Sequence, residues 1–137
     1  MKKMNPVVHF EMPYEDSKRI AKFYSSAFGW QTHALGAEMG NYVLATTTES
    51  ETTEKASIRP KTPGTINGGF YQKTEDMPAQ FPSVVIAVDD IQEAMAKVQA
   101  AGGKVLGEPM EIPGVGTYVS FFDTEGNRVS MMQPLMK

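Results

Sequence analysis

The sequence predicts an α+β fold made of two copies of a strand–helix–three-strand unit. The 137 residues suit one domain. Alternating and helical apolar patterns follow one another in the order βαβββ, linker, βαβββ. A shift of about 74 positions lays the first half on the second and superimposes Asp16 on Asp90 and Gly29 on Gly103. We therefore expect one domain over residues 1–137, with a first module at about 6–73, a linker at about 74–82 and a second module at about 83–134.

The first module opens with a strand at residues 7–12, in which apolar side chains alternate with a face that carries His9 and Glu11. Asp16 is a typical N-cap, an apolar stripe at helical spacing follows it, and Gly29 is the expected helix end. Further strands are predicted at residues 32–35, 41–46 and 66–72. The apolar face of the first strand should pack on helices, which leaves His9 and Glu11 on the wetter face.

Residues 47–64 have almost no large apolar side chains and are rich in Thr, Ser and Glu. This composition indicates an exposed loop, either a surface excursion or a lid. Residues 75–81, with prolines nearby, are expected to be a linker.

The second module repeats the pattern with a strand at residues 84–88. Asp90 and Glu93 form a capping-box signature, and Gly102 and Gly103 end the apolar helix that follows. Three strands are predicted at residues 104–106, 117–122 and 128–132. Residues 123–127 have the composition of a hairpin turn.

Composition excludes several classes of protein. The chain has no cysteine, so disulfides, thiolate metal sites and cysteine nucleophiles are ruled out. The net charge is −3, and the thirteen Lys and Arg residues are scattered, which gives no indication of a nucleic-acid partner. No apolar run is long enough to span a membrane. We expect a soluble cytoplasmic protein.

Three segments resemble the vicinal oxygen chelate superfamily of glyoxalases, bleomycin-resistance proteins and extradiol dioxygenases. They are residues 7–13 continuing to 28–30, residues 84–90 with the helix end at 101–103, and residues 121–127, Phe-Phe-Asp-Thr-Glu-Gly-Asn. The sequence is most similar to a glyoxalase-related branch without a defined activity. The resemblance implies two curled mixed sheets that face each other across a cleft, a small-molecule ligand in that cleft, and a homodimer.

Metal-dependent members of the superfamily take one ligand from each of four strands. Carried over, these positions fall on His9, on Ser83, on Ser130, and at Gly69 or Phe70. Only His9 has a side chain typical of a metal ligand. A divalent metal is therefore possible but not favoured, with His9 as its ligand if one is bound.

His9 and Glu11 are the candidate catalytic residues, because alternation along a strand points both side chains the same way. One could accept a proton while the other tunes its pKa. The alternative is an ordinary hydrogen-bonded polar pair without a catalytic role. His33 is expected to be an exposed residue on an edge strand.

Aromatic and hydroxyl side chains are expected to line the ligand pocket. None of the serines lies in a Gly-x-Ser-x-Gly motif, so no serine nucleophile is indicated. The leading hypothesis is a small-molecule-binding protein. One alternative is a lyase or isomerase related to lactoylglutathione lyase that uses His9 and Glu11, with or without a divalent metal. Another is a non-catalytic assembly module. The predicted pocket residues are Trp30, Tyr42, Phe70, Ser83, Ser120, Phe122 and Ser130.

Overall fold

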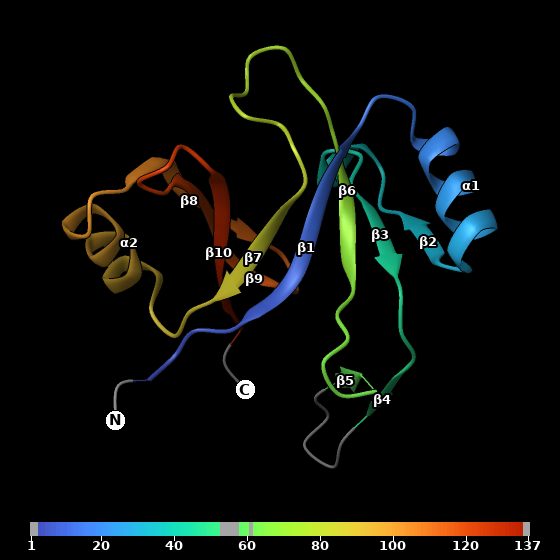
Figure 1. Ribbon diagram of the computed structural model, residues 1–137, viewed down its shortest axis with the longest axis horizontal. Helices are drawn as coiled ribbons and strands as arrows, with labels where there is room; N and C mark the ends of the chain where they lie inside the picture. The colour runs from blue at the N-terminus through green and yellow to red at the C-terminus, as the bar shows by residue number, and fades with distance from the viewer. Residues whose placement is uncertain (1–2, 53–57, 61, 136–137) are drawn as a thin grey trace. The chain divides into compact units, whose positions relative to one another are not determined.

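The computed structural model describes residues 3–52, 58–60 and 62–135 of the chain. They form two compact units (Figure 1). Module one is the unit His9–Met77, and module two comprises residues 3–8 and 78–135. Residues 3–8 belong to module two, where the Ala87 amide donates to the Pro6 carbonyl over 2.9 Å.

Module one contains a mixed four-stranded sheet in the order β2-β3-β6-β1, with α1 beside it (Figure 1). Strands β1 and β6 are parallel, and the other pairs are antiparallel. Its elements are β1 (Val7–Tyr14), α1 (Ser17–Phe28), β2 (Gln31–Ala34), the 3₁₀ turn η1 (Ala37–Met39), β3 (Val43–Thr46), β4 (Ser50–Thr52), β5 (Ile58–Pro60) and β6 (Gly68–Gln72).

Module two repeats this arrangement with the order β7-β10-β9-β8. Strands β7 and β10 are parallel, and β9 is antiparallel to both of its neighbours. The elements are β7 (Ser83–Ala87), α2 (Ile91–Ala100), β8 (Lys104–Ile112), β9 (Gly116–Phe122) and β10 (Arg128–Pro134). The predicted βαβββ duplication is therefore confirmed, with β4 and β5 as additional strands in module one.

Both helices begin where the sequence predicts, and α1 also ends at the predicted Gly29, whereas α2 ends at Ala100 with Ala101 as its C-cap, just before the predicted Gly102 and Gly103. The Asp16 carboxylate accepts from the Arg19 amide over 3.0 Å, and the Asp90 carboxylate accepts from the Glu93 amide over 3.1 Å. Each bond satisfies an amide that a first helical turn leaves without an intrahelical partner. Gly29 ends α1 with φ of 74°, a left-handed conformation that glycine adopts without a steric penalty.

The pairing register identifies equivalent positions in the two modules. Glu11 lies opposite Gly69 in module one, and Val85 lies opposite Ser130 in module two. Because Glu11 and Val85 are 74 positions apart, Gly69 is the counterpart of Ser130. The sequence left this position open between Gly69 and Phe70, and the internal symmetry assigns it to Gly69.

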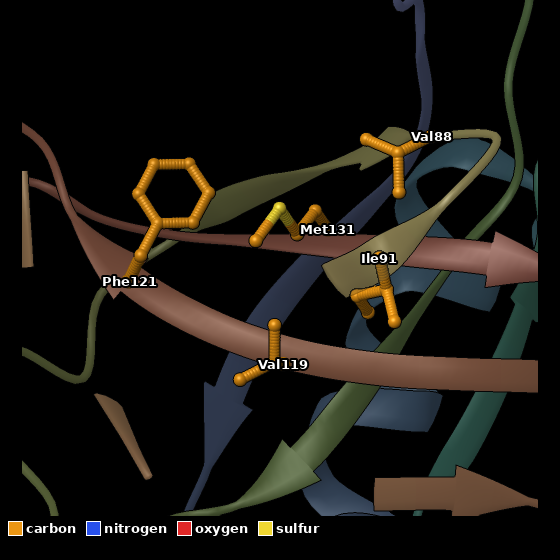
Figure 2. Close-up of a cluster of buried hydrophobic side chains, with 5 residues drawn as sticks. All are labelled: Val88, Ile91, Val119, Phe121 and Met131. Carbon is orange, nitrogen blue, oxygen red and sulfur yellow. The ribbon is translucent and has the colours of Figure 1, made fainter. Parts of the chain in front are cut away.

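Each module has its own hydrophobic core between sheet and helix. In module one the buried core residues are Tyr14, Val43, Ala45 and Phe70, and side chains of α1 and β1 pack around them. In module two they are Val88, Ile91, Val119, Phe121 and Met131 (Figure 2). The apolar face of β1 packs on the helix side, as predicted, so His9 and Glu11 point to the opposite face.

Residues 47–64 were expected to form an exposed loop, but the structure places two short strands within this segment. The short antiparallel strands β4 and β5 lie within this segment, with Glu51 opposite Arg59. Residues 53–57 and 61 lie outside the described part of the chain. The prediction relied on large apolar side chains to mark strands, whereas these segments contain β-branched residues such as threonine, which also favour extended backbone.

Candidate functional site

Three polar side chains of module one meet on the sheet face opposite α1. The Tyr42 hydroxyl oxygen lies 2.9 Å from Nε2 of His9, and Tyr42 donates to Oε2 of Glu11 over 3.3 Å. Glu11 is buried and His9 is half-buried. We call His9, Tyr42 and Glu11 the polar triad. The structure therefore links the predicted residues His9 and Glu11 through the hydroxyl group of Tyr42.

Gly69 makes room for the triad. A Cβ built at Gly69 would lie 2.1 Å from Cε2 of Tyr42 and 2.2 Å from both Cζ and the hydroxyl oxygen. Contacts this short do not occur between real atoms, so the end of the Tyr42 ring lies where any larger residue would place its side chain. The absence of a side chain at position 69 fixes the path of the tyrosine towards His9 and Glu11.

The environment of His9 favours its neutral form. Burial lowers the pKa of the imidazole below its ordinary value. At neutral pH the ring is therefore uncharged, with one nitrogen that donates and one that accepts a hydrogen bond. A neutral imidazole next to a buried carboxyl group is suited to accept a proton or a hydrogen bond from a ligand.

The equivalent face of module two carries hydroxyl groups. The Ser130 hydroxyl lies 2.6 Å from the Tyr118 hydroxyl and 2.9 Å from the Ser120 hydroxyl. Ser120 and Ser130 are buried and lie directly opposite each other on β9 and β10. Ser83 begins β7 and Phe122 ends β9, and both side chains are half-buried.

Two of the predicted pocket residues belong to the helix-side core instead. Phe70 is fully buried, and its ring lies 5.4 Å from the ring of Tyr24 on α1. Trp30 stacks on Tyr24 with ring centroids 4.5 Å apart. Since Phe70 directly follows Gly69 on β6, alternation turns its side chain away from the polar triad. We leave Trp30 and Phe70 out of the candidate site.

The residues present do not fit the metal site of the superfamily. Module one offers His9 and Gly69 at the ligand positions, and Gly69 has no donor and is covered by the Tyr42 ring. Module two offers Ser83 and Ser130, and the Ser130 hydroxyl is already shared with two other hydroxyls. Within residues 3–52, 58–60 and 62–135, no three His, Asp or Glu side chains gather closely enough to hold a metal ion.

A separate hollow of about 470 Å³ lies in module one at the start of α1. Its lining includes Tyr14, Asn41 and Gln72, and none of the predicted site residues. The polar groups there are paired with one another, since Tyr14 donates to the Asn41 carbonyl over 2.7 Å and the Asn41 amide donates to Gln72 over 3.2 Å. The hollow is therefore distinct from the polar triad.

The sequence indicates an aromatic surface at Tyr42, whereas the structure shows that the Tyr42 hydroxyl bridges His9 and Glu11. A signal was present in the repeat. Leu44 on β3 and Ser120 on β9 lie opposite the equivalent positions Gly69 and Ser130. Tyr42, directly before β3, and Tyr118 on β9 are therefore counterparts, since each lies two residues earlier in the chain. In each module the hydroxyl of this tyrosine lies within hydrogen-bonding distance of polar side chains on the sheet face.

Comparison with known proteins places the chain in a family. Residues 7–131 match the model of the Glyoxalase/Bleomycin resistance protein/Dioxygenase superfamily. A glyoxylase-like domain-containing protein of Didymella fabae is 32% identical over 118 residues, which cover 85% of this chain and 84% of the relative. The anthracycline biosynthesis protein DnrV of Streptomyces peucetius is 30% identical over 118 residues, or 85% of this chain and 42% of DnrV.

Solved structures agree on the fold. The methylmalonyl-CoA epimerase of Streptomyces coelicolor aligns with a TM-score of 0.67 at 13% identity and covers 98% of this chain and 100% of the epimerase. In the described part of the chain, no helix has the length and apolar character needed to cross a membrane. The predicted α+β glyoxalase-like fold is confirmed, and the chain belongs to the Glyoxalase/Bleomycin resistance protein/Dioxygenase superfamily.

Proposed function

We propose that this protein binds a small organic molecule against the sheet face of module one that carries the polar triad, without the usual metal of the superfamily. The observation that supports this most directly is the triad itself. Burying the Glu11 carboxyl, and partly burying the imidazole and the phenol, costs free energy that their mutual hydrogen bonds offset in part. A polar cluster kept on the face away from the helix core is accounted for by recognition of a ligand.

The proposed ligand is a flat, partly aromatic molecule with hydroxyl or carbonyl groups. Tyr42 provides an aromatic ring on this face, and His9 and Glu11 provide polar groups that fix orientation. The name of the relative DnrV, an anthracycline biosynthesis protein, supports this class of ligand. Anthracyclines are flat, hydroxylated and fluorescent, so daunorubicin is a suitable probe.

The test is a fluorescence titration of daunorubicin with the purified protein in buffer that contains EDTA. We expect saturable 1:1 binding that is weakened at least about tenfold in Tyr42→Ala, which removes both the ring and the hydroxyl. Tyr24→Phe, which removes a hydroxyl on the helix side, is the matched control and should bind like the wild type. Binding that is non-saturable, or equal in all three proteins, contradicts the proposal.

A second candidate function is proton transfer as a lyase or isomerase. A specific observation favours it, namely a neutral imidazole joined to a carboxyl group through one phenol. The structural neighbours named as methylmalonyl-CoA epimerases support a search for this chemistry. Incubation of methylmalonyl-CoA with the protein in D₂O should incorporate deuterium next to the carbonyl, and His9→Gln should abolish it. No incorporation above the buffer rate contradicts this function for that substrate.

Assembly as a homodimer and a cytoplasmic location stay predictions. Sedimentation velocity at micromolar concentration tests the first, and a single species with the mass of one 15.1 kDa chain would contradict it.

A further inference from the structure

The hydrogen bonds of the polar triad have a direction, and the direction determines which nitrogen of His9 carries the proton. A phenol has one hydrogen to donate. Tyr42 donates this hydrogen to Oε2 of Glu11 over 3.3 Å.

The contact between Tyr42 and His9 then has only one possible direction. With its hydrogen used on Glu11, the Tyr42 oxygen must accept from Nε2 of His9 across the 2.9 Å separation. In the neutral ring this requires the proton on Nε2 and leaves a lone pair on Nδ1. The order of donation is His9 Nε2–H to Tyr42, and Tyr42 O–H to Glu11.

The second nitrogen of His9 is open to a ligand. Among the described residues, no group forms a hydrogen bond with Nδ1. In the same part of the structure, no side-chain nitrogen or oxygen is both fully buried and without a partner. Nδ1 is therefore accessible to solvent, although His9 as a whole is half-buried.

We propose that Tyr42 is a positioning residue that holds His9 in the Nε2–H form, so that Nδ1 is the acceptor for a hydroxyl group of the ligand. The ligand class is thus narrowed to molecules with an O–H donor, such as a phenol or an enol. Gly69 completes the arrangement, because only a residue without Cβ lets the tyrosine ring reach both partners. The part that concerns the ligand rests on the proposed function, whereas the part that concerns the tautomer does not.

The experiment is ¹⁵N NMR of the imidazole nitrogens in ¹⁵N-labelled protein above pH 7. His33→Gln removes the only other histidine, so all imidazole signals come from His9. We expect Nε2 to resonate as a protonated nitrogen and Nδ1 as an unprotonated one. Tyr42→Phe should convert this single form into a mixture of both tautomers, and Tyr24→Phe should leave it unchanged.

Gly69→Ala provides a second variant that keeps the tyrosine but displaces its ring, and it should produce the same mixture. Circular dichroism confirms that each variant is folded before its spectrum is interpreted. A wild-type His9 protonated on Nδ1, or a tautomer that is unaffected in both variants, overturns the proposal. It would mean that donation runs from Glu11 towards His9, or that Tyr42 does not control the ring.

Addition of daunorubicin tests the ligand contact of Nδ1 separately from the tautomer of His9. The Nδ1 resonance should move towards its hydrogen-bonded value while Nε2 stays in place, and Tyr42→Phe should weaken binding about three- to tenfold. Binding that leaves Nδ1 unchanged overturns the role assigned to this nitrogen and retains the proposed function. A tautomer as expected without any binding retains the positioning role of Tyr42 and counts against the proposed function.

Discussion

Replacing Gly69 with alanine tests whether the Tyr42 ring occupies the space over this strand position. The new Cβ would lie about 2.1 Å from the ring, so either the strand shifts or the tyrosine swings out. Overpacking of this kind costs about 1–3 kcal/mol. Loss of the two Tyr42 hydrogen bonds costs about 1–3 kcal/mol as well, at 0.5–1.5 kcal/mol each. We expect Gly69→Ala to lower the free energy of unfolding by about 1–3 kcal/mol.

A double-mutant cycle with Tyr42→Ala isolates the contact. Without the ring, the three short contacts to the methyl group are absent, and alanine restricts the unfolded chain more than glycine does. Gly69→Ala should then stabilise the protein by about 0.4–1 kcal/mol. Urea unfolding of the four proteins measures the coupling, expected at about 2 kcal/mol. A cost of Gly69→Ala that is equal in both backgrounds would refute the contact between Gly69 and Tyr42.

Three further predictions concern stability. Because burial lowers the pKa of His9, the unfolded chain takes up a proton on this residue before the folded protein does. Two proteins that both carry His33→Gln are compared by urea unfolding, one with His9 and one with His9→Gln. The free energy of unfolding of the protein with His9 should fall relative to the other as the pH decreases from about 6.5. Parallel plots of unfolding free energy against pH would contradict this. Phe70→Ala should lower the free energy of unfolding by about 3–5 kcal/mol because Phe70 is fully buried. Phe28→Ala, at a position 65% exposed, should lower it much less. Equal losses in urea unfolding would be inconsistent with the place of Phe70 in the helix-side core. Asp16→Ala and Asp90→Ala should each cost about 1 kcal/mol in thermal unfolding, since each removes the carboxylate that caps a helix, and no loss in either variant would argue against the caps.

The architecture could be predicted from the sequence because short-range patterns in the chain mark each element of the repeated unit. Asp16 and Asp90 cap helices, Gly29 needs a positive φ, and apolar alternation in β1 separates a helix face from a polar face. These features depend on neighbours within a few positions of the chain. The β4–β5 hairpin escaped prediction because it has no apolar pattern of this kind.

The candidate site was only partly predictable for a different reason. His9 and Glu11 share a strand, so their common face follows from alternation. The link through Tyr42 depends on the pairing register of β3 with β6 and of β6 with β1, which no local pattern fixes. Register also decides that Gly69, and not Phe70, is the counterpart of Ser130, and hence that Phe70 belongs to the core.

A two-dimensional amide NMR titration of the ¹⁵N-labelled protein with daunorubicin in the presence of EDTA shows where the ligand binds and whether it needs a metal. We expect the largest shifts at His9, Glu11, Tyr42 and Gly69. Shifts confined to the hollow around Tyr14 and Asn41, or shifts that appear only when a divalent metal replaces EDTA, would contradict it.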